Sequence, residues 1–105
     1  SKVSRGVADS RIIYIDHFGN AYTGIKEGDL ETLGLSYGDE LRVVIPRRNV
    51  DIRVRFLRSY GYANEGEVLA LINSEGFLEF SVNRGSFAQR FGVEEGDEIT
   101  ISIIK

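Results

Sequence analysis

The sequence contains no cysteine, no methionine and no tryptophan, and it has a single proline and a single histidine. Without cysteine, the chain cannot form a disulfide framework, a thiolate nucleophile or a cysteine-ligated metal site. The same absence is compatible with a reducing compartment, and we expect a cytoplasmic protein. The lone histidine, His17, has no second histidine with which to hold a metal ion or relay a proton. We therefore expect no metal site.

Long apolar runs and an excess of basic charge are also missing. No run approaches the roughly 20 consecutive apolar residues that a membrane-spanning helix requires. The first residues lack the apolar centre of a signal peptide. The formal net charge is −3, whereas a protein that neutralises nucleic-acid phosphates normally carries a basic excess. We expect neither a membrane nor a nucleic acid as a partner.

The length and composition predict one domain. The chain has 105 residues, of which 42% are hydrophobic and 28% are charged, and this is enough for one compact domain with a modest core. A second domain does not fit within residues 1–105. The complete absence of methionine, an initiator methionine included, favours a piece of a longer chain, and processing of the N-terminus is the alternative explanation.

The hydrophobic pattern is typical of β-strands. Residues Val50–Phe56 alternate between apolar and charged side chains, as in a strand that is buried on one face only. Gly28–Leu33 and Ser86–Phe91 have the character of short helical turns, the second with Ser86 as its N-cap. We expect an all-β fold, a small antiparallel β-barrel of about seven strands. The other strands are predicted at Arg11–Asp16, Ala21–Ile25, Leu41–Ile45, Val68–Ile72, Leu78–Val82 and Ile99–Ile104.

An internal repeat supports a closed β architecture. Residues 33–45 align with residues 91–103 without gaps, and each copy has a turn, a Gly-Asp pair and an alternating strand. Gly38 and Gly96 suit a tight turn that needs a positive φ angle, and the aspartates that follow them are common turn formers. We interpret the repeat as a recurrent way of entering a barrel strand rather than as a pair of catalytic acids.

Polar and aromatic side chains gather after the first predicted strand. Asp16 can accept hydrogen bonds from an ammonium or hydroxyl group, and Asn20 offers an acceptor and two donors in one plane. Such an amide suits the N6 and N7 edge of adenine, and Phe18, or Tyr60 from a later turn, can stack on the ring. The alternative is that the segment is only a tight turn with Phe18 as a core plug, because Asp and Asn favour turns.

A cluster of arginines lies between Arg47 and Arg58 and can steer a phosphate or a nucleic acid. Asp51 interrupts the cluster, and the strand pattern places Arg53 and Arg55 on a solvated face. This arrangement favours an outer hairpin or a subunit contact.

Four motifs in order along the chain carry a resemblance to a known family. Residues 15–25 resemble the pattern Ile-Asp-x-Phe-Gly-Asn-x-x-Thr-Asn-Ile, and residues 73–86 resemble Asn-Ser-x-Gly-x-Leu-Glu-x-x-Val-Asn-x-Gly-Ser. Ser59-Tyr60 with Gly66 matches an intervening Thr-Tyr and Gly, and residues 91–97 match Leu-Gly-x-x-x-Gly-Asp. Together these motifs make the chain similar to the C-terminal domain of the S-adenosyl-L-methionine (SAM) hydroxide adenosyltransferases. These are the SAM hydrolases, whose relatives include fluorinase and chlorinase.

The resemblance implies a larger enzyme with an N-terminal α/β domain and a C-terminal antiparallel barrel. The ligand would lie between the N-terminal domain of one subunit and the barrel of its neighbour in a trimer. SAM would be the substrate, with no other cofactor. The other domain would supply the activated water, so that this chain carries no catalytic residue and is inactive alone. By position, the substrate-binding residues are Asp16 for the methionine ammonium, Phe18 and Tyr60 for the aromatic wall, Asn20 for the adenine edge, Ser74 for the amino-acid end, and the backbone at Val82 and Arg84 for the adenine rim.

Two positions depart from the family pattern. Gly24 replaces the Asn of Thr-Asn-Ile, which removes a turn-stabilising amide. Glu75 stands where relatives carry a small residue or, in halogenating members, an arginine that meets the methionine carboxylate. Because an acid is unfavourable beside a carboxylate, Glu75 either points to solvent or changes how the amino acid is recognised.

The sequence therefore predicts the adenosyl-binding domain of an enzyme that converts SAM and water to adenosine and methionine. The alternative is a non-enzymatic β-barrel module whose Arg47–Arg58 patch binds a nucleic acid or a protein. Whether the nucleophile is hydroxide or halide stays open, because the residues that select it would lie in the other domain.

Overall fold

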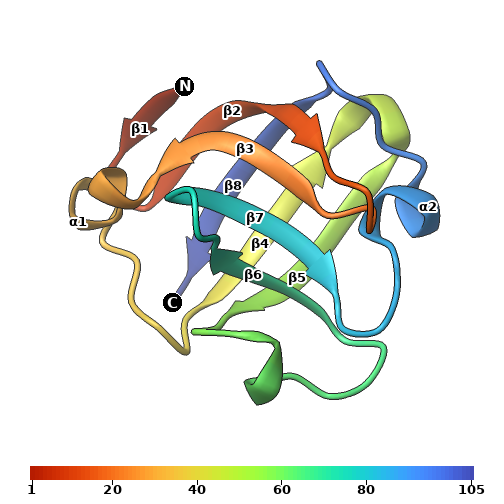
Figure 1. Ribbon diagram of the computed structural model, residues 1–105. Helices are drawn as coiled ribbons and strands as arrows, with labels where there is room; N and C mark the ends of the chain where they lie inside the picture. The colour runs from red at the N-terminus through yellow and green to blue at the C-terminus, as the bar shows by residue number, and fades with distance from the viewer.

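The chain folds into a closed β-barrel (Figure 1). The computed structural model describes all 105 residues. Seven strands follow one another around the barrel in the order β2-β3-β7-β6-β5-β4-β8, and β8 pairs with β2 to close it, while β1 pairs only with β2. The strands are β1 (Lys2–Ser4), β2 (Val7–Ile15), β3 (Ala21–Lys26), β4 (Glu40–Ile45), β5 (Val50–Phe56), β6 (Val68–Ile72), β7 (Phe77–Val82) and β8 (Glu98–Ile104).

The predicted all-β barrel is confirmed, and one pairing departs from the antiparallel pattern. β5 and β6 run parallel, with Arg55 opposite Leu69. Parallel neighbours need a crossover connection, and residues 57–67 provide it, including the 3-10 turn η3 (Tyr60–Tyr62). Leu57 from this connection packs with Leu69 and Leu71 in an apolar cluster separate from the main core. The crossover therefore covers the outer face of β6, which explains why this strand is apolar on both faces.

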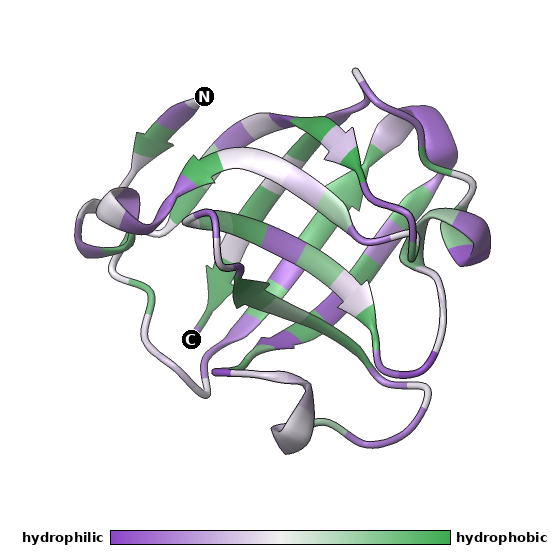
Figure 2. Cartoon of the chain, viewed as in Figure 1, coloured by the Kyte–Doolittle hydropathy of each residue, from purple (hydrophilic) through white to green (hydrophobic).

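The core follows from the alternation of side chains along the strands. On β5, Val50, Val54 and Phe56 are buried, whereas Asp51 and Arg53 are exposed, as the sequence predicted. Figure 2 shows the same alternation as green and purple bands along β5. The interior apolar side chains form one continuous cluster of 20 buried residues. Each large side chain buried in this way stabilises the fold by about 1.5 to 3 kcal/mol.

Two short helices lie on opposite sides of the barrel in the view of Figure 1, and both match the predicted helical turns. They are α1 (Leu30–Leu33), preceded by the 3-10 turn η1 (Glu27–Asp29), and α2 (Phe87–Phe91). Ser86 is the predicted N-cap of α2, since its Oγ accepts a hydrogen bond of 3.0 Å from the amide of Gln89. Phe87 is fully buried, with its ring centroid 5.9 Å from that of Phe80 on β7. This contact fixes α2 beside the end of β7.

The two copies of the repeat lie next to each other, because β4 and β8 pair with Leu41 opposite Ile103 and Val43 opposite Ile101. Val43 and Ile101 are also equivalent positions of the repeat, so a local two-fold axis passes between them. The turns before the two strands contain Gly38 and Gly96 with φ angles of 93° and 95°. Each following aspartate accepts a backbone amide of its own turn at 2.9 Å. The interpretation of the repeat as a way of entering a strand is confirmed.

The first part of the chain differs from the prediction. β2 begins at Val7 rather than Arg11, and β1 was not predicted. The residues from Val7 to Arg11 pair with β8 and close the barrel. Their composition does not show this role, since closure depends on a partner about 90 residues away along the chain. No helix of the structure has the length and apolar character to cross a membrane.

Candidate functional site

A concavity of about 390 Å³ opens at the rim of the barrel where β2 ends, β3 begins and β7 ends. In Figure 1, the connection from β2 to β3 and the end of β7 lie on the same side of the barrel as α2. The concavity is lined by Phe18, Asn20, Tyr60 and the turn Val82–Gly85. Segments more than 60 residues apart in the chain therefore meet here, and most of the site residues that the sequence predicted belong to them.

Asp16 organises the first of these segments as a tight turn. Its Oδ1 accepts hydrogen bonds of 2.9 Å from the amides of Phe18 and Asn20. Its Oδ2 accepts bonds from the Asn20 Nδ2 at 2.9 Å and from the Tyr22 hydroxyl at 3.3 Å. All four donors are neutral, and Asp16 makes no ion pair. No cationic side chain of the chain is paired with this carboxylate, which lies behind the concavity.

The bond to Asp16 sets the orientation of the Asn20 amide. A carboxylate only accepts hydrogen bonds, so the group that faces it must be the Nδ2 of Asn20. The Oδ1 of Asn20 makes no hydrogen bond within the protein, and its Nδ2 keeps a second N–H. Asn20 is only 8% exposed, and it is one of the residues that line the concavity. It therefore presents one acceptor and one donor, which matches the N6 and N7 edge of adenine.

Phe18 is not the core plug of the turn interpretation, because its side chain is 73% exposed. His17 lies beside it with the two rings edge to face at 5.5 Å. An apolar ring with this much exposure at the mouth of a concavity is a candidate contact for a ligand or for a second protein domain.

The turn Val82–Gly85 forms the opposite wall. The Gly85 amide donates a 3.0 Å hydrogen bond to the Val82 carbonyl, and a Cβ atom at position 85 would lie 2.8 Å from the Val82 Cγ1. Between them Arg84 has a φ angle of 62°, which is unusual for a residue other than glycine. Neither the amide nor the carbonyl of Arg84 makes a hydrogen bond within the protein. Both are available to a ligand.

Tyr60 enters the concavity from the crossover and is held by a buried acid that the sequence analysis missed. Its hydroxyl donates a 2.7 Å hydrogen bond to the Oε2 of Glu79, and the Ser81 hydroxyl donates to the same oxygen at 2.5 Å. Glu79 is 3% exposed. Burial raises the pKa of Tyr60 to about 12, and the hydrogen bond and charge of Glu79 act in the same direction. The sequence did contain a signal for this contact, because Glu79 stands within the apolar run of β7 and a buried charge needs partners.

Tyr22 is a second phenol that the prediction left out. It lies opposite Glu79 in the β3–β7 pairing. Burial raises the pKa of Tyr22 to about 12, and the charges of Asp16, Glu79 and Glu75 raise it further. Acids and phenols therefore line the outer face of β3 and β7 between the rim at Asp16 and the turn at Glu75. None of these acids is paired with a basic side chain.

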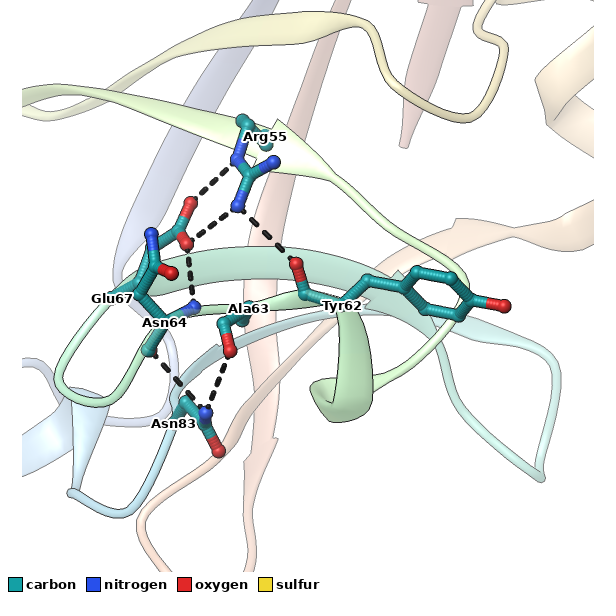
Figure 3. A network of polar contacts seen from close by, with 6 residues as sticks. All are labelled: Arg55, Tyr62, Ala63, Asn64, Glu67 and Asn83. Atoms are coloured by element: carbon teal, nitrogen blue, oxygen red, sulfur yellow. Dashed lines mark hydrogen bonds and ion pairs between the residues drawn. The ribbon is translucent and has the colours of Figure 1, made fainter.

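The remainder of the crossover is anchored by polar contacts (Figure 3). Arg55 on β5 binds both carboxylate oxygens of Glu67 at 2.7 and 2.6 Å and donates to the Tyr62 carbonyl. From the other side, Asn83 donates to the carbonyls of residues 63 and 64 at 3.2 and 3.3 Å. Asn83 also lines the concavity, so the same residue borders the site and fixes the segment that carries Tyr60.

Ser74 lies apart from this group. It is exposed in the turn between β6 and β7, at the opposite end of β7 from Val82, a separation of roughly 17 Å along the strand. The structure brings five of the predicted residues to the concavity, places Asp16 directly behind Asn20, and leaves Ser74 outside it. Glu75 is exposed and forms no ion pair, and the buried Nδ2 of its neighbour Asn73 has no hydrogen-bond partner.

Most arginines of the predicted basic patch are paired with acids. Arg47 has no carboxylate partner, and Arg58 lies over the ring of Tyr37, with its Cζ 4.3 Å from the centroid. The paired members are Arg48 with Asp97 and Glu94, Arg53 with Glu40, and Arg55 with Glu67. A patch neutralised in this way offers few free cations to a phosphate backbone.

Known proteins resemble this chain in sequence. Residues 10–100 match the family described as the SAM hydroxide adenosyltransferase C-terminal domain. An (R)-S-adenosyl-L-methionine hydrolase of Methanocaldococcus jannaschii is 35% identical over 94 residues, covering 87% of this chain and 34% of the relative. A fluorinase of an Actinoplanes species is 31% identical over 104 residues, covering 97% of this chain and 35% of the relative. The chain thus spans about a third of these proteins.

Solved structures show the same fold. A conserved protein of Thermotoga maritima superposes with a TM-score of 0.88 at 32% identity, covering 96% of this chain and 38% of that protein. A conserved protein of Thermus thermophilus superposes with a TM-score of 0.66 at 29% identity, covering 98% of this chain and 37% of that protein.

Proposed function

This chain belongs to the SAM hydroxide adenosyltransferase family, and from that premise we propose that it binds the adenosyl and methionine parts of SAM in an enzyme that hydrolyses this substrate. The products are adenosine and methionine. Water attacks the C5′ carbon of the ribose and gives up one proton, and methionine departs with the electrons of the broken carbon–sulfur bond. The barrel contributes by holding and orienting the substrate and by excluding bulk water.

The observation that carries this proposal is the concavity at the barrel rim. A flat purine needs a ring to stack on and a planar amide or backbone groups at its polar edge. Phe18 and Tyr60 supply the rings, Asn20 supplies a free acceptor and donor, and Arg84 supplies an unpaired amide and carbonyl. Residues chosen only because they form turns would not be expected to line one hollow.

The charge around the site favours the cationic end of the substrate. The Asp16 carboxylate has neutral donors only, and Glu79 has only hydroxyl groups as partners. An ammonium or sulfonium group gains favourable Coulomb energy from both acids, and the gain is larger where water is excluded. We assign the methionine ammonium to Asp16. The amino-acid carboxylate is bonded to the same carbon atom as this ammonium, so it cannot lie at Ser74, at the far end of β7, while the ammonium is at Asp16, and Ser74 is not assigned to it.

The rest of the enzyme is part of the proposal. The matched relatives are about three times longer than this chain. An N-terminal α/β domain from a neighbouring subunit of a homotrimer would cover the exposed Phe18 and supply the activated water. The cytoplasm is the proposed location.

A titration tests the binding role. Adenosine added to the ¹⁵N-labelled chain should shift the amide resonances of residues 16–20 and 82–85. Asn20→Ala should weaken binding by about 1 to 3 kcal/mol, the range for losing a bidentate contact with adenine. Asn64→Ala is the matched control, because its side chain makes no hydrogen bond and lies outside the lining of the concavity. Equal affinities of the Asn20 variant and the parent would refute the assignment.

Two further measurements separate this proposal from the basic-module alternative. The isolated chain should not release adenosine from SAM, because the water-activating residues belong to the proposed second domain. Sustained release of adenosine by the pure chain would contradict the assignment of water activation to the second domain. Duplex DNA should bind weakly at every salt concentration, whereas a nucleic-acid module would show tight binding that falls steeply as salt rises.

A further inference from the structure

Part of the crossover that carries Tyr60 is hydrogen-bonded to the barrel through a single side chain. Its other contact is that of Arg58, which lies over the ring of Tyr37. Residues 62–67 are anchored through Arg55 and Asn83, and Leu57 is packed in the outer apolar cluster. Between these anchors, the backbone of residues 58–61 makes hydrogen bonds only within the crossover. The hydroxyl of Tyr60 makes the only hydrogen bonds that join these residues to the barrel, and they go to Glu79 and Ser81 on β7.

We infer that Glu79 is a positioning residue that holds the ring of Tyr60 as the wall of the concavity by accepting a hydrogen bond from its hydroxyl group. The inference rests on the proposed function for the identity of the ligand, and the position of the ring is a property of the chain alone. The hydroxyl of Tyr60 is hydrogen-bonded to Glu79 and Ser81, so Tyr60 presents only its ring to the ligand. Glu79 acts through Tyr60 and touches no reacting atom.

The burial of Glu79 makes this contact strong. Glu79 is 3% exposed and has no basic partner, so the charge of its carboxylate is stabilised by the two hydroxyl groups that donate to it. Hydrogen bonds to an ionised acceptor are shorter and about twice as strong as neutral ones. Tyr60 is a suitable donor because burial raises its pKa to about 12, which keeps its proton in place. Ser81 completes the group and lies 3.3 Å from the Tyr60 hydroxyl.

The test combines a readout of Tyr60 with a readout of ligand binding. The chain is labelled with ¹³C-tyrosine, and the ring resonances and titration of Tyr60 are followed by NMR, while adenosine is the ligand probe. Glu79→Ala should change the ring environment of Tyr60, lower its pKa towards the ordinary value of a tyrosine, and weaken adenosine binding by about tenfold or more. Glu79→Gln keeps an acceptor oxygen, so it should also lower the pKa but hold the adenosine affinity within about threefold of the parent.

Matched variants separate positioning from a general loss of stability. Asp97→Asn removes an equally buried acid whose partner is Arg48, and it should leave the Tyr60 resonances and the adenosine affinity unchanged. Tyr62→Phe alters the neighbouring phenol, which is 65% exposed, and should have no effect on binding. In a Tyr60→Phe background, Glu79→Ala should cost no further affinity, because the hydroxyl through which it acts is already absent.

The outcomes are distinguishable. Unchanged Tyr60 resonances in Glu79→Ala, or the same loss of adenosine affinity with and without the Tyr60 hydroxyl, would overturn the positioning role. If Glu79→Ala does not fold, the folded Glu79→Gln variant decides through the pKa of Tyr60, and an unchanged pKa overturns the inference. If the Tyr60 resonances respond as expected but the parent chain and its controls show no adenosine shifts, the proposed function fails and the positioning role stands.

Discussion

Asp97 and Glu79 are both buried carboxylates, and their partners are of opposite kinds. Asp97, 4% exposed, pairs with Arg48 through hydrogen bonds of 2.7 and 3.2 Å, and the Arg48 contact holds its pKa below the ordinary value. Glu79, 3% exposed, has only the hydroxyls of Tyr60 and Ser81 as partners. The first acid has its charge balanced within the chain, and the second does not.

This difference separates a structural acid from an acid at a site. The pair of Asp97 with Arg48 connects the segment after β4 to the turn before β8. Its two charges balance each other, so no unpaired charge remains to bind a ligand. Glu79 lies with Asp16 beside a concavity, and both acids remain without a cation in the chain. Buried charges are usually paired, and an unpaired group of them fits a ligand that brings the missing positive charge.

The largest expected effect is the loss of stability in Asp97→Ala. The substitution leaves Arg48, only 24% exposed, without its main partner and removes the acceptor for the Glu94 amide. We expect the free energy of unfolding to fall by about 3 kcal/mol, as measured by urea denaturation. Asp39→Ala is the control in the equivalent turn, where no arginine is bound, and it should cost about 1 kcal/mol. Equal losses would show that the arginine adds nothing.

A smaller loss is expected from valine at the glycine of either repeat turn. Gly38 and Gly96 have φ angles of 93° and 95°, and no atom lies within 4 Å of a Cβ at either position. The cost is therefore backbone strain, about 1 to 3 kcal/mol for a β-branched residue, and it should be the same for Gly38→Val and Gly96→Val. Gly28→Ala, at an open position without positive φ, should melt with the parent. Clearly different losses in the two turns would mean that they are not equivalent.

The next largest effect is a loss of stability at acid pH, caused by protonation of Asp97 in its pair with Arg48. The pKa of Asp97 is lowered by its hydrogen bond to Arg48, so the folded state binds a proton less tightly than the unfolded state. This stabilisation is present above the ordinary aspartate value of 3.8 and is lost as the pH falls from there towards the lowered pKa. Urea midpoints measured between pH 5 and pH 2 should therefore fall less in Asp97→Asn than in the parent. Parallel curves would contradict the assignment.

The smallest effect is a loss of stability at alkaline pH, caused by the ionisation of Tyr22 and Tyr60 beside the unpaired acids. The pKa of Tyr22 and of Tyr60 is raised from 10.0 to about 12, chiefly by burial. The folded state therefore holds both phenolic protons more tightly, and the stabilisation present below pH 10 is lost as the pH rises towards about 12. Tyr60→Phe should reduce this alkaline loss, whereas Tyr62→Phe should not. The measurement is the thermal midpoint across pH 9 to 12.

Local patterns in the sequence were enough for most of the fold. The strict alternation of Val50–Phe56 gave the bounds of β5 as the structure has them, and Ser86 gave the start of α2. The glycines of the repeat gave the two turns. Each of these features depends on a few neighbouring residues, whose preferred dihedral angles and side-chain directions already follow from their own sequence.

The candidate site was predicted in part. Asp16, Phe18 and Asn20 were found because they form one turn, Tyr60 was named as an alternative stacking ring, and Val82 and Arg84 were added through the family resemblance. Ser74 lies at the far end of β7, and neither Glu79 nor Tyr22 was foreseen. Their roles depend on which strands become neighbours, and this is not encoded in the spacing of residues along any one strand.

The sequence by itself determined that the chain forms a β-barrel with strands at these positions, because the alternation of side chains and the turn residues act over short distances. Only the tertiary structure decided the parallel pairing of β5 with β6, the closure of β2 on β8, and the partners of the two buried acids. In the local sequence, Asp97 is an acid directly before a strand and Glu79 is an acid within one. Closure of the barrel brings an arginine to one and a tyrosine to the other, and the charge left unbalanced at Glu79 follows from that arrangement.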